Sequence, residues 1–130
     1  MPNELNKLEG KKILCVEDDV FLSDLIAKKV TDNKGKLLHA GNGEDALKLI
    51  ESDKPDLVLL DVLLPGLDGF EILKRIRENP VTKDLPVVIL SNLGQKNDLE
   101  KGKQYGATKF LIKATVSLEE IVREINVVLG

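Results

Sequence analysis

The chain has 130 residues, 42% of them hydrophobic and 32% charged, which is the size and balance of one folded domain rather than of a disordered segment. Its 19 Lys and Arg against 22 Asp and Glu leave a net charge of −3, so we expect no direct nucleic-acid partner, because such modules carry a basic face. No apolar run approaches the roughly 18 residues of a membrane-spanning helix, and residues 1–10 lack the apolar stretch of a signal peptide; we therefore expect a soluble, cytoplasmic domain without membrane insertion.

The first half of the chain predicts three strands separated by two helices. After a polar stretch at residues 1–9, which we expect to be a flexible N-terminal tail, continuous apolar blocks at 13–16 and 57–60 are typical of strands buried on both faces. A weaker block at 37–40 lies between two glycines and predicts a strand at an edge. The first helix carries an apolar stripe of Phe21, Leu22, Leu25, Ile26 and Val30, and the second a stripe of Ala46, Leu47 and Ile50.

The second half continues the alternation. A third helix, with the stripe Phe70, Leu73 and Ile76, must end near Asn79 because a proline follows. Continuous apolar blocks at 87–90 and 110–112 are likewise typical of strands buried on both faces. They enclose a mostly polar stretch at 95–105, which predicts a marginal, exposed helix with Leu99 and Gly102 facing inward. The last helix begins with the capping-box pair Ser117 and Glu120 and has the apolar stripe Leu118, Ile121, Val122, Ile125, Val128 and Leu129.

Strict alternation of five strands and five helices predicts an α/β fold, with a parallel sheet covered by helices on both faces. In such sheets the functional crevice lies at the carboxyl ends of the strands, near the point where the strand order reverses. If the order is 2-1-3-4-5, strands one and three are neighbours there. Glu17 and Asp18 after the first strand and Asp61 at the end of the third would then share one crevice. Ser91 and Lys113, which follow the fourth and fifth strands, would lie on its far side.

This group of side chains has the chemistry of a phosphoryl-accepting site. Crowded carboxylates repel one another, and a ligand set made of oxygen alone suits Mg²⁺ or Mn²⁺ rather than Zn²⁺. A lysine beside them can neutralise an anion, a hydroxyl can donate to it, and a spare carboxylate can act as the nucleophile. Each acid taken singly is better interpreted as a helix-terminal or loop charge, and Asp19 as a helix cap. Their combination at the strand ends favours the site.

From about residue 11 to residue 129, the chain resembles the receiver domains of two-component response regulators, the family of the chemotaxis single-domain regulators. The matching motifs, in order and at family spacing, are ILCVED at 13–18, AGNGEDA at 40–46, PDLVLLD at 55–61 and LPGLDG at 64–69. The resemblance implies a flavodoxin-like, doubly wound sheet of five parallel strands in the order 2-1-3-4-5 with five helices. It also implies a receiver domain over residues 10–130.

The resemblance further implies roles for the acidic residues. Asp61 would be the phosphoacceptor, taking a phosphoryl group from the phosphohistidine of a sensor histidine kinase or phosphotransfer protein. Asp18 and Asp61 would ligate Mg²⁺ (or Mn²⁺) directly. Glu17 would act through water, and the backbone carbonyl of Leu63 would complete the protein ligands.

The remaining implied roles concern the response to phosphorylation. Lys113 would pair with the phosphoryl oxygens, and Ser91 would donate a hydrogen bond that draws the end of the fourth strand toward the site. Phe110 stands at the family's aromatic switch position, although it could equally be a core aromatic. The chain would signal to an unknown downstream protein through its fourth helix, fifth strand and fifth helix. We expect a monomer or weak dimer that catalyses only its own phosphorylation and slow autodephosphorylation.

Three features depart from the family's pattern. Ala114 stands where the family usually has a proline with a cis bond, and because a cis bond before alanine costs about 2.5–4 kcal/mol, we expect a trans bond. Asn92 stands where a small residue is usual and would narrow the approach to Asp61. Leu63 and Leu93 would flank the phosphoryl group, and since apolar side chains cannot orient a hydrolytic water, they predict a long-lived phosphoryl state.

Two other functions stay open. A degenerate receiver would bind its partner without phosphorylation; Ala114 and Asn92 favour this, whereas the intact acidic residues and lysine count against it. A Mg²⁺-dependent aspartyl phosphohydrolase would need a second acid two residues after the nucleophile, where Leu63 stands. A flavin carrier is disfavoured by the scarcity of aromatic residues. We interpret His39 and Cys15 as structural.

Overall fold

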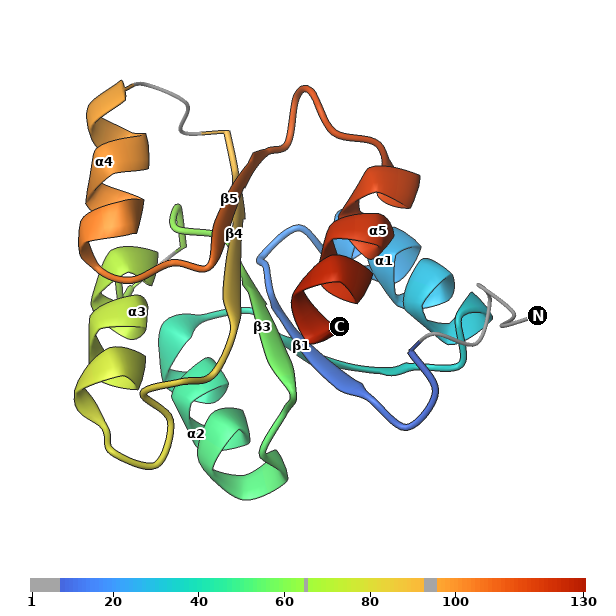
Figure 1. The fold of residues 1–130 in the computed structure, drawn as a ribbon, viewed down its shortest axis with the longest axis horizontal. Coiled ribbons are helices and arrows are strands. Elements are labelled where there is room, and N and C mark those ends of the chain that lie inside the picture. The colour runs from blue at the N-terminus through green and yellow to red at the C-terminus, as the bar shows by residue number, and fades with distance from the viewer. Residues whose placement is uncertain (1–7, 65, 93–95) are drawn as a thin grey trace.

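The computed structural model describes residues 8–64, 66–92 and 96–130, and within them five strands alternate with five helices (Figure 1). The strands are β1 (Lys12–Val16), β2 (Lys36–Ala40), β3 (Leu57–Leu60), β4 (Val87–Ser91) and β5 (Lys109–Ile112). The helices are α1 (Val20–Asp32), α2 (Gly43–Asp53), α3 (Gly69–Glu78), α4 (Lys96–Gln104) and α5 (Leu118–Leu129).

The five strands form one parallel sheet in the order β2-β1-β3-β4-β5. Val16 at the end of β1 lies opposite Ala40 of β2 and Leu60 of β3, so the carboxyl ends of these strands meet at one edge of the sheet. The doubly wound, flavodoxin-like fold with strand order 2-1-3-4-5 is therefore confirmed. The strand order reverses at β1 and β3, the position where such folds build their sites.

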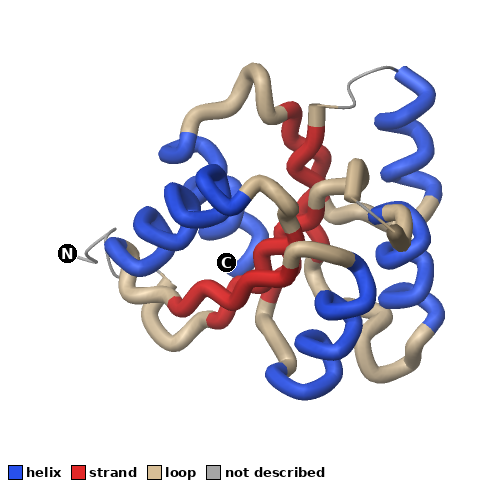
Figure 2. The backbone as a smooth tube through the Cα atoms, turned by 180° about the vertical axis from the view of Figure 1, so that it is seen from behind, coloured by secondary structure: helices blue, strands red, loops and turns tan. Residues whose placement is uncertain are grey.

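Helices cover both faces of the sheet, and the core has two layers. α1 and α5 lie on one face and α2, α3 and α4 on the other; the view from behind shows the strands between the two groups (Figures 1 and 2). Because successive side chains of a strand point to opposite faces, each central strand contributes to both layers. One layer contains Leu14, Val16, Val58, Leu60, Val87 and Ile89. The other contains Ile13, Cys15, Leu57, Leu59, Val88 and Leu90.

Two predictions about burial are wrong. The block at 110–112 is not buried on both faces, because β5 lies at the edge of the sheet and is half-buried throughout. Phe21 does not belong to the core stripe of α1 and is 74% exposed. At 100° per residue, Phe21 lies roughly 140° around the helix from the buried Ile26, and the small Ser23 takes an inward position instead.

Leu8, which lies in the stretch that we expect to be a flexible tail, packs against the core. Leu8 is fully buried with the α1 and α5 layer of the core, and its N–H donates to the carbonyl of Asn33 at 3.2 Å. Leu5 and Leu8 are the two leucines of the mostly polar stretch 1–9, and two apolar positions are too few to establish a helical or strand period, so the sequence alone does not indicate that Leu8 is buried. Residues 1–7 of the expected tail lie outside the described residues.

The expected ends of the helices are found. α3 ends at Glu78, before Asn79, and α5 begins with the predicted capping box between Ser117 and Glu120. α4 is exposed as predicted, with Gly102 buried and Leu99 half-buried.

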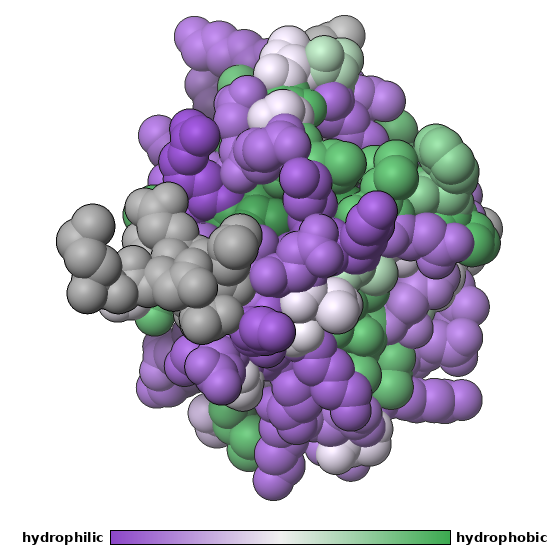
Figure 3. All heavy atoms as spheres, turned by 90° about the vertical axis from the view of Figure 1, so that its right-hand side faces the viewer, coloured by the Kyte–Doolittle hydropathy of each residue, from purple (hydrophilic) through white to green (hydrophobic). Residues whose placement is uncertain are grey.

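The surface on the side of α1 and α5 is mainly hydrophilic, with hydrophobic side chains visible between polar ones (Figure 3). Val127 of α5 is 61% exposed. No helix in the described part of the chain combines the length and the apolar composition needed to cross a membrane.

Leu8→Ala should lower the free energy of unfolding by about 2–5 kcal/mol, because it removes a fully buried leucine and leaves a cavity. Urea denaturation measures the change. The exposed Val127 provides a matched control, and Val127→Ala should change stability by no more than about 0.5 kcal/mol. If Leu8→Ala is as stable as the unaltered protein, Leu8 belongs to a loose tail after all.

Candidate functional site

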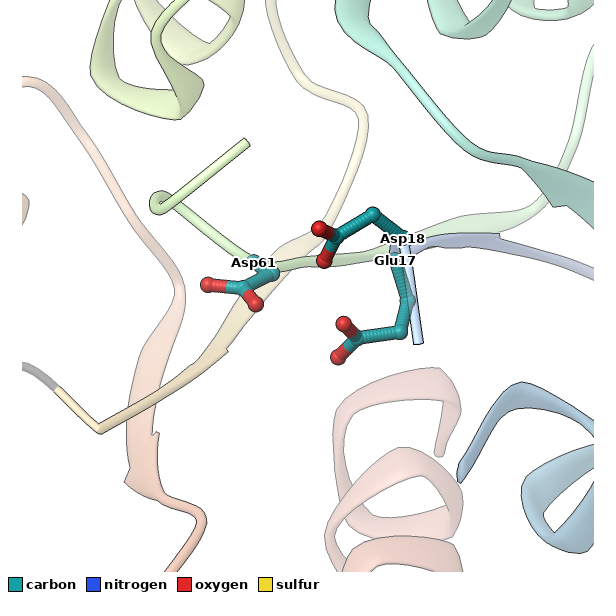
Figure 4. Close-up of side chains that lie close together, drawn as sticks. All are labelled: Glu17, Asp18 and Asp61. Carbon is teal, nitrogen blue, oxygen red and sulfur yellow. The ribbon is translucent and has the colours of Figure 1, made fainter. Parts of the chain in front are cut away.

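Three carboxylates meet at the carboxyl edge of the sheet. Glu17 and Asp18 follow β1 and Asp61 follows β3, and a carboxylate oxygen from each lies within 4.8 Å of the others. The side chains of Glu17 and Asp18 leave the end of β1 in opposite directions, and both carboxylates turn toward the side on which Asp61 lies (Figure 4). Glu17 is 2% and Asp61 5% exposed, whereas Asp18 is exposed. Two of the acids are therefore removed from solvent, and the third lies at the mouth of the site.

Lys113, in the loop after β5, reaches both buried acids. Its Nζ donates to Oδ2 of Asp61 at 2.7 Å and lies 2.5 Å from Oε1 of Glu17. The lysine side chain is itself only 17% exposed. One ammonium thus faces three carboxylates, which leaves an excess of negative charge in the crevice.

Asp61 is held by both of its carboxylate oxygens. Oδ2 accepts from Lys113, and Oδ1 accepts from the backbone N–H of Leu63 at 2.9 Å. A carboxylate has about four acceptor positions on its two oxygens, so these two bonds orient the group and leave lone pairs for another atom. The Leu63 side chain is 54% exposed. The hydrogen bond from the Leu63 N–H to Asp61 depends on the backbone of the turn after β3. Because any residue other than proline could make it, the sequence does not predict it.

Glu17 is fixed through its backbone as well as its side chain. Its N–H donates to the carbonyl of Ala40 at 3.0 Å, and its own carbonyl accepts from Nε2 of His39 at 2.7 Å. The Glu17 carboxylate accepts from the N–H of Asp19 at 3.1 Å. His39 therefore has the structural role that the sequence predicts, because it holds the backbone of Glu17, one of the three clustered acids. Asp19 caps α1 as predicted, accepting from the N–H of Leu22.

The charges of Glu17 and Lys113 depend on each other. Burial raises the pKa of the Glu17 carboxyl above 4.5, and the negative charge of Asp61 raises it further, while hydrogen bonds from Lys113 and the N–H of Asp19 act in the opposite direction. Burial lowers the pKa of Lys113, but its hydrogen bonds to Asp61 and Glu17 outweigh that effect and hold this pKa above 10.5. The lysine is therefore protonated at neutral pH and serves as the internal counter-ion of the two buried acids.

Gly69 allows α3 to begin close to Asp61. A Cβ at this position would lie 2.3 Å from Cα of Val62 and 2.7 Å from the carbonyl oxygen of Asp61. Any side chain would therefore push the start of α3 away from the site. The family motif predicts a glycine here, but the contact that requires it is visible only in the structure.

Ser91 and Phe110 lie on the β4 and β5 side of the site. Ser91 ends β4, is fully buried, and accepts from the N–H of Lys113 through its carbonyl at 3.0 Å. Phe110 is half-buried; its ring lies against Gly102, where a Cβ would meet the ring at 3.0 Å. The peptide bond between Lys113 and Ala114 is trans, as expected.

Asn92, which we expect to narrow the approach to Asp61, is exposed. Leu93, which we expect to flank the phosphoryl group together with Leu63, lies outside the described residues.

The donor set fits a hard divalent cation. All three clustered ligands are carboxylates, and Mg²⁺ and Mn²⁺ bind oxygen ligands in preference to nitrogen and sulfur. The excess of negative charge around Lys113 gives such a cation an electrostatic reason to bind. The same excess would oppose the approach of an anion to Asp61 while no cation is bound.

Residues 13–126 match the family model of the response regulator receiver domain. The transcriptional regulatory protein AfsQ1 of Streptomyces coelicolor is 37% identical over 101 residues, which cover 78% of this chain and 44% of AfsQ1. Protein PilH of Pseudomonas aeruginosa is 33% identical over 119 residues, or 92% of this chain and 98% of PilH. The chain thus spans less than half of AfsQ1 and nearly all of PilH.

Solved structures give the same result. The BeF3-activated N-terminal receiver domain of Klebsiella pneumoniae RstA superposes with a TM-score of 0.83 at 30% identity, covering 91% of this chain and 97% of that one.

Lys113→Ala should lower the free energy of unfolding of the metal-free protein at pH 7 by about 3–5 kcal/mol, because it leaves two buried carboxylates without their counter-ion. The loss should shrink toward pH 5, since protonation of Glu17, whose pKa is raised by burial, removes one of the unpaired charges. In the unaltered protein the stabilising charge of Lys113 is complete below pH 10.5 and lost as the pH rises through the raised pKa. Urea denaturation across this pH range measures both effects.

Lys109→Ala is the matched control, because Lys109 pairs with Glu124 at a more exposed position, 37% against 17% for Lys113. We expect it to cost less than about 1 kcal/mol. Equal losses in the two variants, or a loss in Lys113→Ala that does not change with pH, would contradict the role of Lys113 as internal counter-ion.

Proposed function

This chain belongs to the response regulator receiver domain family, and on that basis we propose that it is a phosphoacceptor of a two-component system in which Asp61 takes the phosphoryl group. The observation that carries the proposal is the arrangement around Asp61, a buried carboxylate oriented by Leu63 and Lys113 beside two further acids. The donor would be the phosphohistidine of a sensor histidine kinase or a phosphotransfer protein. Signalling by phosphorylation is the general activity of the family.

In the proposed reaction, one carboxylate oxygen of Asp61 attacks the phosphorus of the phosphohistidine. The P–N bond breaks as the P–O bond forms, giving an acyl phosphate, and the donor imidazole leaves with the electron pair and takes up a proton from water. In the unphosphorylated structure, Lys113 donates to Oδ2 of Asp61 at 2.7 Å. Once the aspartate carries the phosphoryl group, this ammonium is placed to pair with the phosphoryl oxygens instead.

A divalent cation completes the proposed site. Mg²⁺, or Mn²⁺, would be held by Asp18 and Asp61, with Glu17 acting through water and the Leu63 carbonyl as a backbone ligand. When bound, the cation supplies positive charge that neutralises the incoming phosphoryl oxygens. The carboxylates that gather at one point support this assignment.

The proposed response passes through β4 and β5. The Ser91 hydroxyl would donate to the phosphoryl group and draw the end of β4 toward the site. Phe110, half-buried against Gly102 of α4, would move with it. The face formed by α4, β5 and α5 would then bind the downstream protein differently in the two states.

Incubation with acetyl phosphate and Mg²⁺ should add one phosphoryl group to the protein, detected by intact mass. Asp61→Asn should take up none, because the nucleophilic carboxylate is gone, and removal of Mg²⁺ with a chelator should abolish the addition. Asp24→Asn is the control, since Asp24 is an exposed acid of α1 that we expect to leave the addition unchanged. No addition to the unaltered protein would refute the proposal and favour a phosphorylation-independent binding module; continuous release of phosphate from many phosphomonoesters would favour a phosphohydrolase.

The phosphorylated protein should decay slowly, because the exposed apolar side chain of Leu63 cannot orient an attacking water. Leu63→Gln should shorten the half-life about tenfold, which corresponds to ~1.4 kcal/mol in the barrier, while the apolar variant Leu63→Met should leave it unchanged. The half-life is measured by the loss of the phosphoryl mass after the donor is removed. Decay of the unaltered protein within seconds would show this prediction to be wrong.

A further inference from the structure

The most buried residue of α4 and its ring contacts with α3 lie toward the C-terminal end of the helix. Gly102 is its only buried residue, and Lys96, Asn97 and Glu100 in its first half are exposed. Farther along, Nζ of Lys101 lies 4.7 Å from the centroid of the ring of Phe70 in α3. The ring of Tyr105, directly after the helix, lies 6.1 Å from the same ring, centroid to centroid. The contacts between α3 and α4 that involve rings are therefore concentrated at one end of α4.

Arg77 of α3 adds a polar clamp at that end. Its Nε donates to the carbonyl of Gly106 at 2.9 Å, and its Nη1 donates to the carbonyl of Leu85 at 2.6 Å. Gly106 belongs to the turn between α4 and β5, and Leu85 lies just before β4. One guanidinium thus joins α3 to the connection into β4, 8 residues away, and to the turn after α4, 29 residues away.

The turn after α4 is shaped for this contact. The N–H of Ala107 donates to the carbonyl of Gly102 at 2.9 Å, and the N–H of Gly106 donates to that of Lys103 at 3.0 Å, which together form a Schellman motif. Gly106 has φ +89°, and a Cβ there would lie 3.0 Å from Nε of Arg77. Glycine is therefore needed both for the left-handed turn and for the approach of the arginine.

α4 meets the proposed switch residue, Phe110, at Gly102. A Cβ at Gly102 would lie 3.0 Å from the Phe110 ring and 3.3 Å from Cδ1 of Ile89, so the helix backbone rests directly on β5 and β4. Any displacement of Phe110 or of β4 is transmitted to α4 at this point. The clamp at Gly106 lies four residues farther along the chain, on the C-terminal side.

We propose that Arg77 is a positioning residue that holds the C-terminal end of α4 in place, so that displacement of Phe110 and β4 tilts the helix about Gly106 rather than detaching it. The contacts of Arg77 that hold this end of α4 do not depend on phosphorylation, whereas the tilt rests on the proposed phosphorylation of Asp61. The two parts can therefore be tested separately.

Hydrogen exchange followed by mass spectrometry tests the held end in the unphosphorylated protein. Arg77→Ala should accelerate exchange of the amides of residues 105–107 several-fold. Arg75→Ala is the matched control, because Arg75 lies on the same helix but is exposed and pairs only with Glu71 in the described structure; it should leave these amides unchanged. Arg77→Lys keeps the charge but lacks the planar fork that serves two carbonyls, so it should restore slow exchange only in part. Unchanged exchange at 105–107 in both Arg77 variants would overturn the proposal.

Exchange after acetyl phosphate and Mg²⁺ treatment tests the tilt. In the unaltered protein, phosphorylation should change exchange at residues 96–100 and around Phe110 and leave 105–107 as slow as before. In Arg77→Ala the change should extend over 96–107, and Arg77→Lys serves in its place if the alanine variant does not fold. A merely structural Arg77 would raise exchange equally in both states without altering the pattern, which would refute the positioning role. If no phosphoryl group is added, the proposed function fails, and the unphosphorylated comparison still decides on the clamp.

Discussion

The ammonium of Lys113 shared between Glu17 and Asp61 is the interaction on which the site depends. The two acids come from the ends of β1 and β3 and the lysine from the loop after β5, so the pairing joins segments from across the sheet. Burying either acid alone would be costly, and the lysine makes the burial of both acceptable. The net charge of the site stays negative, since Lys113 provides one positive charge against Glu17 and Asp61, and Asp18 adds a further negative charge at the mouth. This remaining charge suits a cation and, through it, the proposed phosphoryl group.

The strand order makes that pairing possible. Because β1 and β3 are neighbours and both run toward the same edge, residues 44 positions apart in the chain are brought side by side. Backbone bonds then remove most of the remaining freedom: Ala40 and His39 hold the backbone of Glu17, and Leu63 orients the carboxylate of Asp61. Gly69 keeps the start of α3 close to the same loop. The Asp61 carboxylate is therefore positioned by the strands, turns and helix starts of the fold itself.

The fold and the acidic residues of the site could be predicted because both follow from the order of apolar and polar residues along the chain. Continuous apolar blocks predict β1, β3 and β4, and polar residues directly after them predict the crevice. The pattern fails where burial depends on a single contact. Leu8 is buried although the mostly polar stretch around it establishes no period, and Phe21 is exposed although it belongs to an apolar run. The contacts of Arg77 could not be predicted from the sequence, because an arginine near the end of an amphipathic helix is typical of a solvated face. Its two carbonyl partners also lie 8 and 29 residues away along the chain.

The edges of the sheet have a consequence for how copies of the chain meet one another. β2 and β5 are the outer strands, they are only five and four residues long, and each begins with a lysine, Lys36 or Lys109. An unpaired strand edge offers its N–H and carbonyl groups to any other extended chain, and short edges that carry charge make such pairing unfavourable. Two copies that met β2 to β2 in parallel register would place Lys36 against Lys36, whereas Lys109 is paired with Glu124 within the chain. Short edge strands that begin with a lysine disfavour strand-to-strand pairing between copies, whereas the helical faces have no such restriction.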